Sequence, residues 1–187
     1  IGATGCILTV KALHELHRLI GDQTEPVEIT ISPSGTQLLF RTQQAEMVSQ
    51  IIQGTFPNYQ QLIPKSSTSQ CKMDVGEFLR TVRTASVFAR DGSGIVRLQI
   101  SNTDGGGKVV ISARAEEVGE NTGELEAAID GEPSKIAFNS RYLTDVLAEL
   151  GSGQVTLATT SPSSPGVFTL DGNEDYTHVV MPMFVQW

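Results

Sequence analysis

Hydrophobic and polar positions along this chain follow one plan that repeats three times. In each repeat a short apolar strand precedes a helix of about three turns, and short strands of alternating hydrophobicity follow. The predicted helices span Val10–Ile20, Val75–Val87 and Ser140–Leu150. The repeats begin about 65 residues apart, which is longer than a solenoid unit and shorter than a usual domain.

The predicted strands are short and separated by turn signals. Strands that begin the repeats are expected at Cys6–Thr9, Cys71–Met73 and Lys135–Phe138. Those that follow the helices are expected at Val27–Ile31, Thr36–Arg41, Ala45–Ile52, Ile95–Ile100, Lys108–Ala113, Glu124–Ile129, Gln154–Thr159, Gly166–Leu170 and Thr177–Met181. Tight turns such as 32–35, 104–107 and 171–173 join antiparallel strands, so the predicted class is α+β with the helices in one layer.

Capping residues and apolar stripes support the helices. Thr9, Asp74 and either Asn139 or Ser140 have side chains that can cap the first turn, and Gly21 stands where a left-handed residue ends a helix. One apolar face is predicted to pack inward in each helix. Its residues are Leu13, Leu16 and Ile20, then Val75, Phe78, Leu79, Val82 and either Ser86 or Ala85, then Leu143, Val146, Leu147 and Leu150.

Composition indicates an ordinary globular protein. The chain has 187 residues and 39% hydrophobic content, which is enough to bury a core. No apolar run approaches the ~20 residues of a membrane span, and the start of the sequence lacks the pattern of a signal peptide. Cys6 and Cys71 cannot form a disulfide framework, so we expect small buried side chains and a reducing, cytoplasmic compartment.

Charge is distributed unevenly along the chain. The net charge of −8 argues against a simple high-affinity nucleic-acid binder. The three helices carry five basic and four acidic residues, against eight basic and 17 acidic residues elsewhere. These helix faces are either merely solvated or form a surface that tolerates a polyanion. Their candidate residues are Lys11, His14, Arg18, Arg80, Arg83 and Arg141.

Three segments together resemble one known family. They are Phe56–Lys65, Lys135–Leu147 and His178–Met183, and they resemble the bacterial sliding clamp, the β subunit of DNA polymerase III. The resemblance covers nearly the whole chain, in order. It implies about one and a half clamp domains, with residues 1–66 as the second half of the middle domain plus linker and residues 67–187 as the C-terminal domain.

The family resemblance implies a function without catalysis. Two crescent-shaped subunits form a ring homodimer with helices lining the hole and sheets outside, and the ring encircles duplex DNA as a processivity factor. Sliding requires weak phosphate contacts that do not read sequence. The implied partners are double-stranded DNA and the clamp-binding peptides of polymerase, clamp loader and repair proteins, with no cofactor.

The resemblance also implies a hydrophobic cleft for those peptides. Its residues here are Pro57, Gln61, Leu62, Val179, Val180, Met181, Pro182 and Met183. Methionine forms an adaptable apolar wall that suits several partners. The segment Phe184–Trp187 differs from the basic residue and leucine of relatives, and it either folds over the cleft or is mobile. The implied dimer contact involves Val87, Phe88 and the acidic stretch from Glu116 to Glu126.

Enzyme interpretations find little support in the sequence. His14 and His17 lack a third metal ligand in a recognisable motif, and Gly105–Gly107 joins strands without leading into a helix. The acidic residues 171–175 do not have the spacing of a calcium loop. The alternative function is a non-clamp protein-interaction module of tandem α+β repeats without a DNA role. A hydrolase with an unrecognised site is a third, weaker option.

Overall fold

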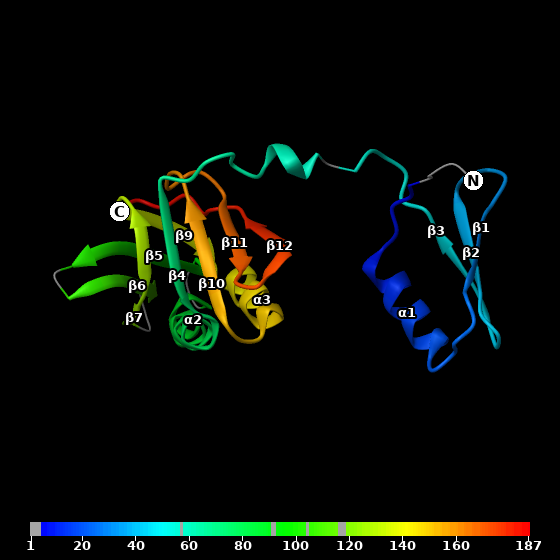
Figure 1. The fold of residues 1–187 in the computed structure, drawn as a ribbon, viewed down its shortest axis with the longest axis horizontal. Coiled ribbons are helices and arrows are strands. Elements are labelled where there is room, and N and C mark those ends of the chain that lie inside the picture. Colours follow the sequence, from blue (N-terminus) through cyan, green and yellow to red (C-terminus); the bar gives the residue numbers. More distant parts are fainter. Residues whose placement is uncertain (1–4, 57, 91–92, 104, 116–118) are drawn as a thin grey trace. The chain divides into compact units, whose positions relative to one another are not determined.

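The computed structural model describes residues 5–56, 58–90, 93–103, 105–115 and 119–187. The chain divides into two compact units, Ile1–Asn58 and Tyr59–Trp187. Figure 1 shows the elements of each unit in sequence colours. Because the two units are separate bodies, each is described by itself.

The first unit combines one helix with a small antiparallel sheet. Helix α1 spans Val10–Ile20, and the sheet has the order β1 (Glu28–Ile31), β2 (Gln37–Arg41), β3 (Glu46–Gln50) in the described residues. The Thr9 hydroxyl accepts a hydrogen bond from the Ala12 amide at 3.2 Å, so the predicted cap is confirmed. The strand predicted at Cys6–Thr9 is wrong, since the described residues there form only an isolated bridge between Ile7 and Ile52.

Few apolar side chains are buried among the described residues of the first unit. All eleven residues of α1 are described and none is buried, and Leu13 of the predicted inward stripe is 50% exposed. The buried apolar side chains among the described residues of this unit are Leu38 and Phe40. Cys6 is exposed, contrary to the prediction that it is buried. A single helix over a three-stranded sheet has too little apolar surface to enclose its stripe.

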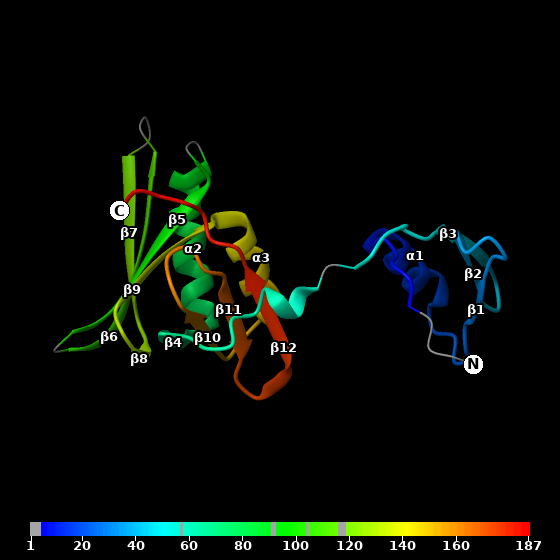
Figure 2. The same cartoon turned by 90° about the horizontal axis from the view of Figure 1, so that it is seen from above.

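The second unit contains two antiparallel sheets and two long helices in its described residues. One sheet has the order β7-β6-β5-β9 and the other has the order β12-β11-β10-β4-β8. Their bounds are β4 (Ser69–Asp74), β5 (Ile95–Thr103), β6 (Gly106–Ala115), β7 (Gly119–Glu126), β8 (Ala128–Gly131), β9 (Ser134–Asn139), β10 (Gln154–Thr159), β11 (Gly166–Leu170) and β12 (Asn173–Val180). The helices are α2 (Val75–Arg90) and α3 (Ser140–Leu150), which lie beside each other (Figures 1 and 2).

The two repeats of the second unit exchange strands. Strand β4 opens the second repeat but pairs with β10 of the third, and β9 opens the third repeat but pairs with β5 of the second. Each repeat therefore completes the sheet of the other. The single strand predicted at Glu124–Ile129 is wrong, because the chain changes sheets there and forms β7 in one sheet and β8 in the other.

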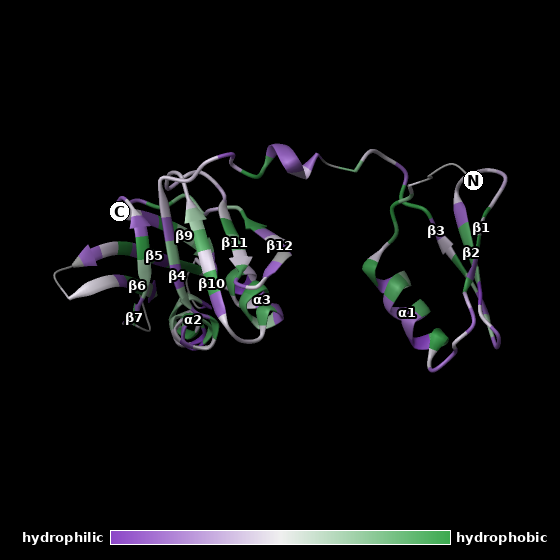
Figure 3. Ribbon diagram, in the orientation of Figure 1, coloured by the Kyte–Doolittle hydropathy of each residue, from purple (hydrophilic) through white to green (hydrophobic). Residues whose placement is uncertain are grey.

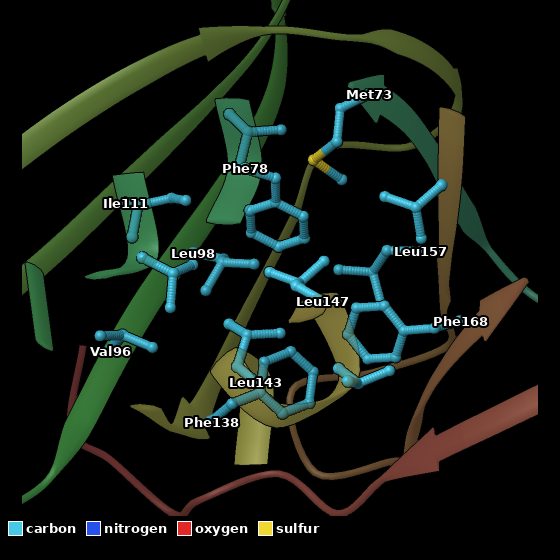
Figure 4. Packing of buried hydrophobic residues seen from close by; sticks show 14 of the residues in the cluster. Met73, Phe78, Val96, Leu98, Ile111, Phe138, Leu143, Leu147, Leu157 and Phe168 are labelled. Carbon is cyan, nitrogen blue, oxygen red and sulfur yellow. The ribbon is translucent and has the colours of Figure 1, made fainter. Parts of the chain in front are cut away.

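The core of this unit lies where both helices meet both sheets. Figure 4 shows Phe78 from α2 and Leu147 from α3 among side chains from strands of the two sheets. Phe138 and Phe168 have ring centroids 5.8 Å apart. The predicted caps are confirmed, since Asp74 accepts from the Glu77 amide and Asn139 from the Arg141 amide, each at 2.9 Å. Most of the predicted stripe residues of α2 and all of those of α3 are buried.

Hydrophobic residues are spread over strands and helices rather than gathered in one long run (Figure 3). Among the described residues, none of the helices is long and apolar enough to cross a membrane.

Candidate partner-binding groove and helix surfaces

The end of β12 changes from core to surface within a few residues. Val180 is buried and pairs with Gly166, and Val179 is half-buried opposite Val167. Met181 follows immediately and is 56% exposed. Of the predicted cleft residues, Val180 therefore supports the core, whereas Met181 exposes an apolar side chain.

The chain beyond β12 is held against the other sheet. Pro182 and Met183 are half-buried, and the Met183 amide donates a hydrogen bond to the Ala137 carbonyl of β9 at 2.7 Å. The red segment after β12 runs toward the side of the unit where β9 lies (Figure 1). The backbone is therefore fixed on both sides of Met181, by the pairing of Val180 with Gly166 and by the hydrogen bond of Met183 to Ala137.

The segment before β4 reaches the same end of the unit. Residues Tyr59–Gln61 form a short 3-10 helix, and Gln61 and Leu62 are exposed. The Thr160 hydroxyl donates to the Ser66 carbonyl at 2.9 Å, which holds this segment at the end of β10. A hollow of about 400 Å³ between this segment and β10–β11 is lined in part by Pro64, Lys65, Ala158 and Val167.

Strand pairing relates the segment before β4 to the segment after β12. The start of β4 pairs with the end of β10 (Ser69 with Thr159), and the start of β11 pairs with the end of β12. The residues just before β4 and just after β12 therefore lie at the same end of the five-stranded sheet, with β10 and β11 between the two strands, and both views place the short helix near that end of β12 (Figures 1 and 2). Pro57 of the predicted cleft lies outside the described residues.

Two exposed aromatic side chains near these elements were not predicted as site residues. Tyr142 is in the first turn of α3, which packs against β12, and Phe184 is 92% exposed. The signal for Tyr142 was present in the sequence, because an aromatic residue off the apolar stripe of an amphipathic helix faces away from the core. Phe184 offered no such signal.

The predicted DNA-facing residues are all exposed on helices. Lys11, His14 and Arg18 lie on α1 of the first unit. Arg18 pairs with Glu15 at 2.5 Å, and this hydrogen bond lowers the pKa of the Glu15 carboxyl. The charge of Arg18 is therefore partly matched within its own helix.

The other three predicted cations lie in the second unit. Arg80 and Arg83 are on α2 and Arg141 is in the first turn of α3, and all three are exposed. Since α2 packs against α3, these guanidinium groups belong to one helical layer.

The predicted dimer residues lie near an open sheet edge. Val87 is half-exposed and Phe88 packs partly into the core, near the end of α2, which also contacts β7. Strand β7 is at the edge of its sheet and carries the exposed acidic residues Glu120, Glu124 and Glu126. Glu124 forms an ion pair with Lys108. Glu116, which begins the predicted acidic stretch, lies outside the described residues.

Burial favours the neutral forms of two side chains in the second unit, the buried Cys71 and the half-buried His178. Burial raises the pKa of the Cys71 thiol to about 12, and burial lowers the pKa of His178, whose Nδ1 lies 3.2 Å from the Tyr176 hydroxyl. In the part of the chain that the structure describes, no group of three or more His, Cys, Asp or Glu side chains is placed to hold a metal ion.

Comparison with known proteins places this architecture in one class, the sliding clamps. Residues 60–184 match the family described as DNA polymerase III beta subunit, C-terminal domain, and the chain therefore belongs to that family. The beta sliding clamp of Caulobacter vibrioides (strain NA1000 / CB15N) is 29% identical over 185 residues, 99% of this chain and 48% of the relative. That of Staphylococcus aureus (strain Mu50 / ATCC 700699) is 28% identical over 178 residues, 95% of this chain and 46% of the relative.

Solved structures agree with this assignment. The DNA polymerase III beta chain of Streptococcus pneumoniae TIGR4 superposes with a TM-score of 0.86 at 26% identity, over 96% of this chain and 47% of that one. The beta sliding clamp of Caulobacter crescentus gives 0.85 at 29% identity, over 99% and 48%. The α+β sliding-clamp fold is confirmed, at about one and a half clamp domains. The chain spans about half the length of the curated relatives that it matches.

Proposed function

We propose that this chain is part of a sliding clamp that encircles duplex DNA and tethers a replicative polymerase to its template. The observation that carries the proposal is the family match over residues 60–184, together with relatives named beta sliding clamp. We assign residues 1–66 to the second half of the middle clamp domain with its linker and residues 67–187 to the C-terminal domain. Ring closure then requires the remaining half of the protein.

The proposed DNA contacts are weak and independent of sequence. Lys11, His14 and Arg18 in the first unit, with the arginine layer of α2 and α3, supply mobile cations on an otherwise acidic chain. Such side chains attract phosphates without reading bases. A few charges at the helix surface are consistent with a protein that slides and is not held in one place.

The proposed partner groove lies at the end of β12, with Met181, Leu62 and Gln61 on its surface and Val179, Val180, Pro182 and Met183 as its supporting wall. Pro57 belongs to the proposed groove by resemblance. Exposed apolar side chains beside fixed backbone favour docking of a short extended peptide. The proposed occupants are clamp-binding peptides of polymerase, clamp loader and repair proteins.

The proposed ring contact uses Val87 and Phe88 with the acidic edge strand β7. An exposed edge strand can pair with a strand of another subunit, and the nearby apolar helix end adds contact area. The acidic side chains disfavour pairing between two copies of β7 and favour a different, complementary surface.

We infer a non-catalytic role in the cytoplasm, with no cofactor. The buried Cys71 thiol and the half-buried His178 are held in their neutral forms, and neither lies in an open cleft with a base beside it.

The groove is tested by adding a synthetic peptide that contains a glutamine followed by spaced leucine and phenylalanine residues. We expect NMR shifts around Leu62 and Met181, and none with a scrambled peptide of the same composition. Shifts that cluster on α1 or α2 would contradict the groove assignment.

A further inference from the structure

Residues Met183–Gln186 have the exposure pattern of an extended chain that rests on a surface. Met183 and Val185 are half-buried, whereas Phe184 and Gln186 are exposed, and Trp187 after them is 46% exposed. Alternation with a period of two is what an extended chain shows when one side rests on a surface. Residues 183–186 therefore rest with one side on the protein.

Two contacts tie this segment to β9. The Met183 amide donates to the Ala137 carbonyl at 2.7 Å, and the Lys135 ammonium lies 5.7 Å from the centroid of the Trp187 ring. Met183 therefore lies at Ala137, and Trp187 lies at Lys135, two residues closer to the start of β9. The segment follows β9 in the antiparallel direction, toward its first residue.

Strand β9 is an edge strand of its sheet. It is the last strand of its sheet, with β5 on one side only. An uncovered strand edge presents unpaired amides and carbonyls to other chains. The hydrogen bond from the Met183 amide satisfies the Ala137 carbonyl of this strand.

Trp187 also forms a wall of a cavity of about 490 Å³. The cavity is also lined by residues of β5 and β9, the turn before β9, the loop after β10 and the segment before β4, and these include Ile100, Pro133, Lys135 and Pro162. Trp187 is 46% exposed, and the Lys135 ammonium lies over its ring. A cation over the face of tryptophan is the strongest of the common cation–π arrangements.

We propose that Met183–Trp187 is a latch: the stacking of Lys135 on Trp187 holds this segment on β9 and fixes the rim of the partner groove at Met181. Met181 stands between two anchors, the pairing of Val180 with Gly166 and the hydrogen bond of Met183 to Ala137. Opening the latch removes the second anchor. The positioning role of Lys135 for Met181 rests on the proposed function, whereas the latch itself does not.

The latch is tested without any partner, because Trp187 is the sole tryptophan of the chain. In Lys135→Ala we expect acrylamide quenching of its fluorescence to rise about twofold and amide exchange at Met183 to quicken about tenfold. Lys135→Arg keeps a cation over the ring and should match the wild type. Lys108→Ala removes a lysine from the same sheet and is the control. Unchanged quenching and exchange in Lys135→Ala would overturn the latch.

The positioning role is tested by peptide titration of the same variants. We expect Lys135→Ala to weaken peptide binding about threefold or more, with Lys135→Arg near the wild type. Equal affinity in both, while Met183 exchange is faster in Lys135→Ala, would overturn the positioning role. A wild-type chain that binds no peptide, but whose Trp187 still loosens in Lys135→Ala, would refute the groove and leave the latch standing.

Discussion

At the scale of single residues, Met181 carries most of the proposed groove. It is the exposed apolar side chain between two backbone anchors. We expect Met181→Ala to weaken peptide binding by about 1 kcal/mol or more, which is roughly a fivefold rise in Kd. Isothermal titration with the synthetic peptide measures this change.

The matched control is Lys11→Ala, which alters a proposed DNA-facing side chain in the other unit. It should leave the peptide affinity unchanged. An equal loss in both variants would mean that Met181 has no special part in binding.

The two cysteines should differ sharply in reactivity. Cys71 is fully buried and burial raises the pKa of its thiol to about 12, so almost no thiolate is present at pH 8. Cys6 is exposed. A colorimetric disulfide reagent should therefore label one thiol per native chain and two after denaturation. Rapid labelling of both in the native protein would show that the packing around Cys71 is wrong.

At the scale of elements, the sequence predicted the helices better than the strands. The bounds of α1 and α3 were predicted correctly, because Thr9 and Asn139 cap them and the apolar stripes have helical spacing. The division between β7 and β8 was not predicted, since a change of sheet at Ala127 depends on pairing with β4 and β6. Local pattern carries no information about such distant partners.

The junction between β9 and β11 should be sensitive to one added methyl group. A Cβ at Gly166 would lie 2.5 Å from the Phe138 ring, which is itself fully buried. We expect Gly166→Ala to lower the free energy of unfolding by about 1–3 kcal/mol, because the core cannot yield. Urea denaturation followed by circular dichroism gives this value.

Gly5→Ala is the comparison for this variant, since a Cβ there meets nothing within 4 Å. It should change the unfolding free energy little. If Gly166→Ala is equally neutral, the packing of β11 against Phe138 is looser than described.

At the scale of the whole molecule, the site was harder to predict than the fold. Pattern and caps alone indicate an α+β chain, but nothing in them brings residues near Leu62 together with Met181, which lies more than a hundred positions later. That pairing comes from the family resemblance and stays a prediction. The contact of Lys135 with Trp187 required coordinates, because Phe184–Trp187 departs from the family pattern.

Binding of DNA to this chain should be weak and ionic. We expect binding to linear duplex to be no tighter than ordinary nonspecific binding, whose Kd is about 10⁻⁴ to 10⁻⁶ M. It should show no sequence preference, and the affinity should fall further as the salt concentration rises. Arg80→Ala should make the slope of log affinity against log salt shallower by about one, the loss of one phosphate contact. Arg41 lies on β2 and forms an ion pair with Glu46, so Arg41→Ala should leave this slope unchanged. Fluorescence anisotropy over a salt series measures both, and tight binding to one sequence that resists salt would contradict the account.

The most direct test of the central claim uses the complete protein to which this chain belongs. It is loaded by its own clamp loader onto a nicked circular plasmid, and the amount that stays with the DNA after gel filtration is measured before and after one restriction cut. A sliding clamp held by topology stays on the circle and slides off the linear product. Equal retention on both forms, or loss from both, would contradict the assignment of this chain to a DNA-encircling ring.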